Sequence, residues 1–447
     1  AKVKQILEPF DLYKPAYFTD KPEEYSEYWG IRAGIFPSVG GTRPLGTTVL
    51  IEDVAFHIED LAEATEDLQN LLEEHGYNDA CIYGHALEGN YHFIIAQSFD
   101  TEEEIAKYRK LMAEVEHLVV DKYDGSLKAE HGTGRNMAPF VKTEWGEKAY
   151  GVMKAVKALF DPKNLINPGV IFTDDPDCFV KNIKPMPLTN PHVDRCIECG
   201  FCEVNCLTCG FSMSSRQRII VQREISRLRA TGEDPQRLAN LQNEFKYLGN
   251  QTCAGDGLCS TSCPMRINTG EMIHDLRAAD LPKDSLGYKT GDFAARHFSG
   301  VKSVLRPVLS VAQGAHAVLG DKAVDSIGRG LNKIGIPLWS SAFPCAYYPK
   351  QLAVKPAELK VVYFPSCINQ TMGKSKGVDK PLVEKTVDLL QKAGYEVIFP
   401  KDMKNLCCGT IWESKGMPDI ADRKSTELEN ALYEATDHGR YPVLCDQ

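Results

Sequence analysis

Apolar positions in the first 130 residues follow strand-like and helix-like spacings in turn. They predict strands and helices in the order strand, helix, strand, strand, helix, strand, at residues 46–56, 58–75, 79–86, 90–97, 101–120 and 126–130. The second helix opens on the glutamates 102–104, which suit the positive end of a helix dipole. This order predicts an antiparallel sheet with helices on one face, a ferredoxin-like α+β layer.

The patterning changes further along the chain. Helical spacing recurs at residues 215–230, 235–248 and 301–320. From residue 359 strands and helices alternate, at 360–365, 380–393, 395–400, 418–435 and 441–445, which predicts an α/β unit with a mainly parallel sheet. Lys302, Arg306 and Pro307 interrupt the segment 301–320, so it predicts an amphipathic helix rather than a transmembrane span. That helix either packs on the body of the protein or docks a partner or a membrane.

Composition narrows the class of protein. The 447 residues include 51 basic and 61 acidic side chains, for a formal net charge of -10, and no run of Lys and Arg. We therefore expect no nucleic-acid partner. The 15 cysteines occur without a signal peptide, which favours thiols in a reducing compartment over disulfides. We expect a cytoplasmic protein, with peripheral attachment to a membrane left open.

The cysteines between residues 196 and 263 have the spacing of an iron–sulfur frame. They read Cys196-x2-Cys199-x2-Cys202-x3-Cys206, then Cys253-x5-Cys259-x3-Cys263-Pro264. In a two-cluster arrangement the first three cysteines take Cys263 as fourth ligand, while Cys253 and Cys259 take Cys206. Paired Cys-x2-Cys units also make tetrahedral zinc sites, which is the competing interpretation.

The second of these clusters is one cysteine short. Asp256 stands where a central cysteine is expected, and the x5 spacing resembles the iron–sulfur subunit of succinate dehydrogenase. An aspartate there also resembles ferredoxins in which a carboxylate holds a fourth iron. We predict one [4Fe–4S] cluster and a second that is either [3Fe–4S] or an Asp256-ligated [4Fe–4S].

A third group of metal-binding side chains lies in the first part of the chain. His85 and His92 flank a tight turn, and Glu130 precedes a loop in which Gly132 and Gly134 allow close approach of a ligand. Two imidazoles and one carboxylate leave an open coordination position, as a catalytic zinc-type site requires. The alternative is a pair of ordinary surface histidines beside a turn.

Five ordered motifs resemble the C-terminal half of the FAD-linked 2-hydroxyacid dehydrogenases, which include D-lactate, glycolate and D-2-hydroxyglutarate dehydrogenases. The motifs are Trp29-Gly-Ile-Arg32, Glu52-Asp53-Val54, Gly84-His85…Gly89-Asn90-Tyr-His92, Glu130-His131-Gly132-Thr133-Gly134 and Asp161-Pro-Lys-Asn-Leu-Ile-Asn167-Pro-Gly169. The resemblance implies a substrate cap over FAD, with the flavin held mainly by an N-terminal domain outside this sequence. The chain is therefore expected to be a fragment, inactive by itself.

The resemblance also implies roles for individual residues. His85, His92 and Glu130 would hold a divalent metal, which we expect to be zinc. Arg32 would pair with the substrate carboxylate, a group that its guanidinium can grip with two hydrogen bonds. His131, with Gly132 and Gly134 after it, would stand beside the flavin and take the hydroxyl proton. Asn167 would lie in the segment that returns to the flavin.

One departure from the family pattern concerns substrate choice. Where the D-2-hydroxyglutarate enzymes carry Tyr-Lys-Tyr-Asp, this chain has Leu50-Ile51-Glu52-Asp53. The lysine that assists carboxylate binding is therefore missing. Arg43 is the candidate replacement, and a solvated loop arginine is the alternative interpretation.

The last cysteines resemble the CCG domain of heterodisulfide reductases and related electron-transfer proteins, whose cysteines bind a further iron–sulfur cluster. The matching residues are Cys367, Cys407, Cys408 and Cys445. The motif normally continues with another cysteine, and the sequence stops at Gln447, so the ligand set is incomplete. Buried thiols at strand ends are the alternative.

Together these features predict five segments: an FAD-linked oxidase cap at 1–173, a proline-rich linker at 174–195, a helical iron–sulfur domain at 196–290, a helical connector at 291–357 and a CCG domain at 358–447. The function expected is oxidation of a small D-2-hydroxyacid, D-2-hydroxyglutarate or D-lactate, with electrons passing through the clusters to an acceptor protein or quinone. The alternative is an electron-transfer subunit of a heterodisulfide-reductase-like complex without dehydrogenase chemistry of its own.

Overall fold

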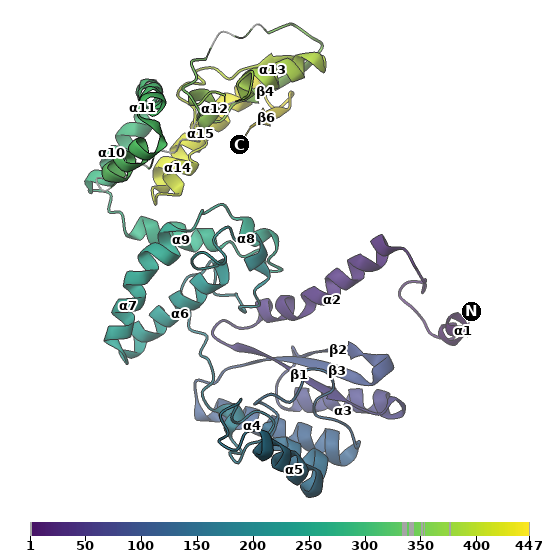
Figure 1. Ribbon diagram of the computed structural model, residues 1–447. Helices are drawn as coiled ribbons and strands as arrows, with labels where there is room; N and C mark the ends of the chain where they lie inside the picture. Colours follow the sequence, from purple (N-terminus) through teal and green to yellow (C-terminus); the bar gives the residue numbers. More distant parts are fainter. Residues whose placement is uncertain are drawn as a thin grey trace. The chain divides into compact units, whose positions relative to one another are not determined.

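The chain folds into two compact units, Ala1–Met272 and Ile273–Gln447, each considered by itself (Figure 1). The structure is a computed structural model that describes residues 2–332, 338, 344–349, 352, 354–374 and 377–446. Within those residues, no helix has both the length and the apolar character needed to cross a membrane.

The first unit contains a small antiparallel sheet and a set of helices. Its strands are β1 (Thr48–Ala55), β2 (Cys81–His85) and β3 (Asn90–Gln97). Its helices are α1 (Lys2–Leu7), α2 (Pro22–Thr42), α3 (Leu61–Glu74), α4 (Glu102–Glu116), α5 (Val141–Phe160), α6 (Ser215–Thr231), α7 (Pro235–Phe245), α8 (Leu258–Thr261) and the start of α9 (Thr269–Ala279). The three predicted strands before residue 100 and the helices between and after them are confirmed.

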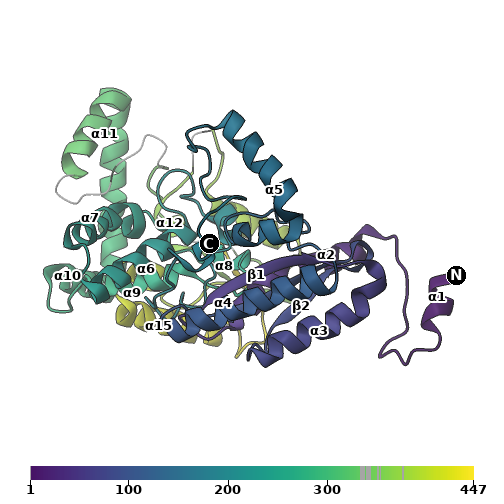
Figure 2. The same cartoon turned by 90° about the horizontal axis from the view of Figure 1, so that it is seen from below.

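The strand order is β1-β3-β2, with both pairs antiparallel. Helices α3 and α4 cover one face, where Val54 and Phe93 join Leu68 and Leu111 in the buried core. Helix α2 contacts β3 and crosses on the opposite side of the sheet (Figures 1 and 2). The predicted layer of helices on one face is therefore present, and α2 makes a second, partial layer.

The fourth strand predicted at residues 126–130 is wrong. Only Ser126 pairs with the sheet, as an isolated antiparallel bridge to Ala55. The backbone N–H groups of the residues that follow bond to side chains instead: Leu127 N–H to Glu144, Lys128 N–H to Ser126, and the next three to Asp53. A ladder cannot form because its donors are already used.

Local signals place the helix starts. Thr101 and Glu104 form a capping box at the start of α4, and Ser214 and Gln217 form another at the start of α6, which satisfies backbone donors that a helix start leaves free.

The segment 174–195 is not wholly a linker. Phe179 and Val180 lie in the core of the first unit, so its first part belongs to that core.

The second unit is built on a parallel sheet, as the sequence predicted, and the strand order is β5-β4-β6. Its strands are β4 (Leu359–Phe364), β5 (Tyr395–Ile398) and β6 (Val443–Cys445). Its helices are α10 (Leu286–Arg296), α11 (Phe298–Asn332), α12 (Cys367–Thr371), α13 (Leu382–Lys392), α14 (Thr410–Glu413) and α15 (Pro418–Ala435). Tyr347 lies in the core with residues of β4.

Helix α11 confirms a helix at 301–320 and extends it, with a break at Gly320. Packing of its apolar face is not confirmed, because Leu309 is buried while the apolar residues at 301, 304, 305, 308 and 319 are exposed. Lys302 is buried on one side, and Val304, Val308 and Val311 are exposed on the other.

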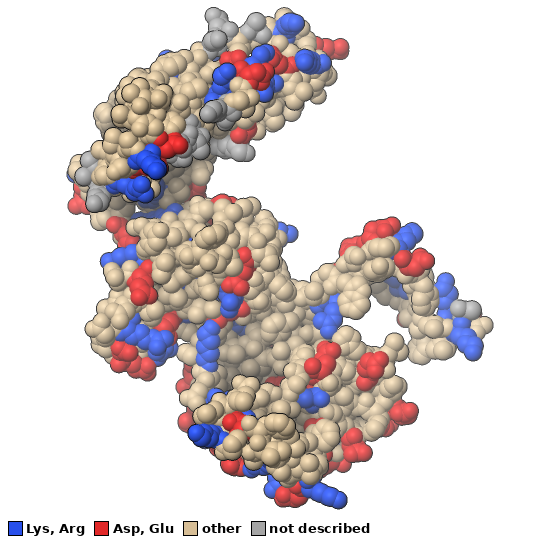
Figure 3. All heavy atoms as spheres, viewed as in Figure 1, with Lys and Arg blue, Asp and Glu red and all other residues tan. Residues whose placement is uncertain are grey.

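Over the face drawn in Figure 3, Lys and Arg are interspersed with Asp and Glu among the described residues.

The close pairing of β2 and β3 generates a test. A Cβ at Gly84 would stand 2.1 Å from the carbonyl oxygen of Asn90. We expect Gly84→Ala to lower the free energy of unfolding by about 1–3 kcal/mol, because backbone atoms cannot move aside as a side chain can. Thermal unfolding followed by circular dichroism measures this.

The matched control is Gly151→Ala, on α5, where a Cβ would meet nothing within 4 Å. That change should leave stability the same or raise it by up to about 1 kcal/mol through better helix propensity. Equal unfolding midpoints for the two variants would contradict the strand pairing.

Candidate functional site

The register of the sheet gathers one group of polar side chains on the α2 side. His92 on β3 pairs with Asp53 on β1 and with Tyr83 on β2, while His85 pairs with Asn90. Directly opposed residues point to the same face of a sheet, so all five side chains point away from the α3 and α4 core. The hairpin thus brings both imidazoles together, as the turn between them predicted.

Glu130 is the point on which the imidazoles converge. Its Oε1 atom lies 2.8 Å from His92 Nε2, 3.6 Å from His85 Nε2 and 3.8 Å from His131 Nε2. The candidate ligand atoms of His85, His92 and Glu130 all lie within 4.8 Å of one another. Two imidazole nitrogens and one carboxylate oxygen, with exposed space above, fit the donor set of a catalytic divalent metal.

Asp53 fixes the backbone of the loop that carries Glu130 and His131. Its carboxylate is fully buried, and Oδ2 accepts the backbone N–H groups of Ala129, Glu130 and His131 at 3.0, 2.7 and 2.8 Å. Oδ1 accepts the Asn90 amide at 2.8 Å. Burial would raise the pKa of Asp53, but these backbone donors outweigh it and the net pKa is lowered. Asp53 is therefore an ionised anchor for the loop that carries two of the site residues.

His92 is in the form that binds metals. It is 1% exposed, and burial lowers its pKa, with the nearby His131 acting in the same direction. The neutral ring that results is the ligand-competent state. His92 Nδ1 lies 3.4 Å from Asp53 Oδ1, a close electrostatic contact outside good hydrogen-bond geometry. The His131 ring stacks on His92 at 4.6 Å between centroids.

Arg32 reaches the same place from α2. Its Nη2 atom lies 3.3 Å from His85 Nε2, and its guanidinium lies over the Tyr83 ring at 5.4 Å. The predicted carboxylate-binding arginine is thus adjacent to the predicted metal ligands. Its side chain is half-buried, which leaves part of the fork open to a ligand.

Arg43, the other arginine proposed for the substrate, lies elsewhere. It is 7% exposed and donates to the backbone carbonyls of Gly40, Thr47, Arg195 and Cys196. Since these carbonyls occupy its guanidinium, it does not supply the charge missing from the Leu50–Asp53 motif. It fastens the end of α2 to the first cysteine loop instead.

The remaining predicted flavin residues lie on nearby backbone. Gly132 and Gly134 both have positive φ angles, 72° and 58°, with open space where a Cβ would stand. Asn167 also has a positive φ and lines a cavity beside α5. The Ile171 N–H donates to the Gly134 carbonyl at 3.0 Å, so this segment returns to the glycine loop.

The seven cysteines of the predicted iron–sulfur frame divide between two cavities. One is lined by Cys196, Cys199, Cys202 and Cys263, and the other by Cys206, Cys253 and Cys259. These are the two groups predicted from spacing, and their role as ligands stays a prediction. Burial raises the pKa of the Cys202 thiol to about 11, so a bound cation is needed to keep it a thiolate at neutral pH.

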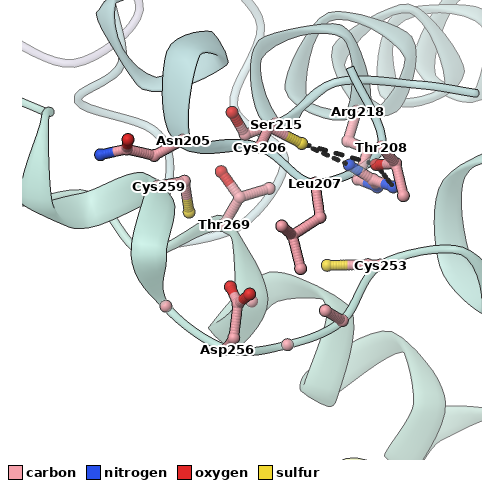
Figure 4. A pocket seen from close by; sticks show the side chains of 14 residues that line it. Asn205, Cys206, Leu207, Thr208, Ser215, Arg218, Cys253, Asp256, Cys259 and Thr269 are labelled. Carbon is pink, nitrogen blue, oxygen red and sulfur yellow. Dashed lines mark hydrogen bonds between the residues drawn. The ribbon is translucent and has the colours of Figure 1, made fainter. Parts of the chain in front are cut away.

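Asp256 lines the second cavity together with its three cysteines. Figure 4 shows Cys253, Cys259 and Asp256 directed into the same space, with Cys206 turned toward Arg218. Asp256 Oδ1 also accepts the Leu258 N–H at 3.1 Å. Its placement fits the position of a fourth, weaker ligand.

The second unit brings two of its predicted ligands together. The Sγ atoms of Cys367 and Cys407 lie 3.5 Å apart, and Cys408 Sγ donates to Thr410 Oγ1. Cys445 is exposed at the end of β6 and pairs with Phe364 of β4. Cys367 and Cys445 therefore lie at the carboxyl edge of the parallel sheet, where α/β folds place ligands.

The sequence did not indicate that Asp53 anchors the loop of the site or that the Tyr83 ring contacts Arg32. Asp53 has a detectable signal, because a carboxylate inside a strand of apolar neighbours is costly unless it is bonded. Tyr83 has none, since a tyrosine in a strand is ordinary.

Asp53→Asn tests the role of this anchor. The amide lacks the negative charge that faces the three backbone donors, and its NH2 group replaces the oxygen that accepts from Asn90. We therefore expect a loss of about 2–3 kcal/mol of stability and reduced binding of zinc. Calorimetry and metal analysis measure the two effects. The control is Asp67→Asn, which breaks contacts to Lys122 and Tyr123 at the surface and should cost at most about 1 kcal/mol. Unchanged stability and zinc content in Asp53→Asn would exclude the anchoring role.

The segment that carries this site is similar to known proteins. Residues 2–171 match the family described as "FAD linked oxidases, C-terminal domain". Among curated relatives, the chain is 28% identical to "Glycolate oxidase subunit GlcD" of Bacillus subtilis over 29% of its own length and 27% of the relative. It is 28% identical to "D-lactate dehydrogenase [cytochrome], mitochondrial" of Arabidopsis thaliana, over 34% and 26% of the two chains.

A third relative is "D-2-hydroxyglutarate dehydrogenase" of Haemophilus influenzae, 30% identical over 33% of this chain and 14% of that protein. The chain thus spans about a quarter or less of the length of these relatives. The site residues Arg32, His85, His92, Glu130 and His131 all fall inside the matched segment. Residues 2–171 are therefore similar to the C-terminal domain of the FAD-linked oxidases.

Proposed function

We propose that this chain is part of an enzyme that oxidises a small D-2-hydroxyacid, D-2-hydroxyglutarate or D-lactate, to the 2-oxoacid. The observation that carries the proposal is the convergence of His85, His92 and Glu130 within 4.8 Å, with Arg32 beside them. The names of the relatives, which refer to glycolate, D-lactate and D-2-hydroxyglutarate, support the same substrate class.

The site residues would bind two groups, a divalent metal and the substrate carboxylate. His85, His92 and Glu130 would hold a divalent metal, with zinc as our choice because nitrogen and carboxylate ligands suit it. The guanidinium of Arg32 would pair with the substrate carboxylate through two parallel hydrogen bonds. A ligand held at both points would have its 2-hydroxyl within reach of His131, whose ring stacks on His92.

His131 is the candidate base. Its ring is partly exposed and stacks on His92, so it can face a bound ligand while the buried ring behind fixes its orientation. An imidazole within reach of a hydroxyl can take its proton near neutral pH. FAD, when bound, supplies the two-electron acceptor for the carbon-bound hydrogen. The open glycine positions 132 and 134 leave room for a flat group beside His131.

The cysteine cavities would carry electrons onward. The first would hold a [4Fe–4S] cluster on Cys196, Cys199, Cys202 and Cys263. The second would hold a [3Fe–4S] cluster, or an Asp256-ligated [4Fe–4S] cluster, on Cys206, Cys253 and Cys259. The separation of the two groups into two cavities supports this assignment.

In the second unit, Cys367, Cys407, Cys408 and Cys445 would contribute ligands to a further cluster. The 3.5 Å contact between two of these sulfurs and their place at the edge of the parallel sheet support it. An acceptor protein or a quinone would then receive the electrons.

Substrate oxidation is tested with full-length protein purified without oxygen. D-lactate, L-lactate, D-2-hydroxyglutarate and glycolate are mixed with it, and bleaching of the flavin absorbance is followed. We expect one D-acid to bleach the flavin, and His92→Ala to slow this about 100-fold or more because metal and base geometry are both lost.

The control is His75→Ala, which removes a histidine paired with Glu114 in the same unit but away from the site. It should bleach at the normal rate. Normal bleaching in a His131→Ala variant would instead favour the electron-transfer subunit without dehydrogenase chemistry in this chain.

The cluster assignment predicts a division of iron between the cavities. Cys263→Ser should remove only the first cluster and Cys253→Ser only the second, because the two sites share no cysteine. Iron analysis and electron paramagnetic resonance (EPR) measure this. Cys209→Ser is the control, since Cys209 is exposed and lines neither cavity.

Asp256→Cys completes the set of four thiolates and should convert the second cluster to a stable [4Fe–4S] form. An unchanged EPR spectrum would contradict the role of Asp256. A colourless protein that holds zinc at the cysteines would contradict the clusters altogether.

A further inference from the structure

Arg218 stands against the second cysteine cavity. It lies on α6, lines that cavity, and is 1% exposed. Figure 4 shows its guanidinium beside the sulfur of Cys206. A cation this deeply buried needs an explanation, because removing a guanidinium from water costs several kcal/mol unless a partner compensates.

The hydrogen bonds of Arg218 explain where its side chain lies, but most of them do not compensate its positive charge. Nε donates to the Gly249 carbonyl at 2.6 Å, and Nη2 donates to the hydroxyls of Thr208 and Thr252 at 2.9 and 3.1 Å. These three acceptors are neutral. Nη1 donates to Cys206 Sγ at 3.7 Å, and this sulfur is the one partner among them that can carry a negative charge.

Two neighbouring arginines on α6 differ from Arg218 in the charge of their partners. Arg223, 3% exposed, donates to Glu198 at 2.7 Å, and Arg216 lies 3.2 Å from Glu203. Both have carboxylate partners. Within the described part of the chain, Arg218 makes no ion pair with a carboxylate, and its hydrogen bonds go to the groups named above.

From this contrast we propose that Arg218 is the fixed counter-charge of the second cysteine site and sets its reduction potential. The proposal rests on the proposed function, in which Cys206 is a thiolate ligand of a cluster. A positive charge and an N–H···S contact both favour the electron-rich, reduced state of a cluster, so they raise its potential. Arg218 is a positioning residue in this sense, since it acts on the cluster through Cys206.

The two sites then differ in their local charge. At the first, Arg223 donates to the Cys196 carbonyl and is neutralised by Glu198, and Arg43 donates to carbonyl oxygens of the loop. At the second, Arg218 faces a ligand sulfur directly. Asp256 is the opposing charge in that cavity, but it is exposed, and solvent screens it more than it screens the buried arginine. Arg218 therefore raises the potential of the second cluster above the value that the same cluster would have without this charge.

The experiment is an EPR-monitored redox titration of full-length protein purified without oxygen. The signals of the two clusters are assigned from Cys263→Ser and Cys253→Ser. In Arg218→Gln, the potential of the second cluster should fall while that of the first stays unchanged. Arg218→Lys keeps the charge and should produce a smaller fall.

Arg229→Gln is the matched control, because it removes the same charge from an exposed position on the same helix. It should move neither potential. A second-cluster potential that does not fall in Arg218→Gln would overturn the proposal. So would equal shifts of both clusters, which would indicate a general change in structure. If Arg218→Gln does not fold, Arg218→Lys decides: a fall confined to the second cluster supports the proposal, and an unchanged potential overturns it.

Failure of the proposed function gives a different result. In that case the unmodified protein shows no iron and no cluster signals, whatever residue stands at 218. If both clusters are present and reducible but indifferent to Arg218, only the present inference fails.

Discussion

A single buried carboxylate organises the candidate catalytic site. Asp53 lies inside β1, and the backbone donors of residues 129–131 converge on one of its oxygens. An ionised group without water is stable only when such donors surround it. The same three bonds keep residues 129 and 130 out of the sheet, and they hold Glu130 and His131 near the hairpin histidines. Asp53 thus contributes both to the loss of the fourth strand and to the candidate metal site.

Buried arginines play the corresponding part around the cysteine loops. Arg43 and Arg223 both donate to the Cys196 carbonyl, one from the end of α2 and the other from α6. Irregular loops carry many backbone acceptors that no ladder satisfies, and guanidinium groups with several donors can satisfy them. Arg43 also ties the cysteine loop to the helix that bears Arg32. The candidate substrate site and the first cysteine cavity therefore share α2 as a common support.

Regular elements and cysteine groups could be predicted because their signals are local. The strand at 90–97 and the helix at 418–435 have the predicted bounds, since alternation and helical spacing are read directly from neighbouring residues. The spacing of the cysteines likewise predicted which of them line each cavity. Short spacings leave a loop few ways to fold around a compact site, so the pattern limits the geometry.

The sequence by itself determined the order of strands and helices apart from the expected fourth strand, the hairpin that brings His85 and His92 to one face, and the grouping of the cysteines. Only the tertiary structure decided that Asp53 takes the donors of the expected fourth strand, that Arg43 is committed to loop carbonyls, and that Arg218 faces the sulfur of Cys206. The partners in the first two cases are separated by 76 to 78 and by up to 153 residues. Periodicity reports which face of an element is buried, but not which distant polar group meets a buried charge there, because that depends on how the elements pack.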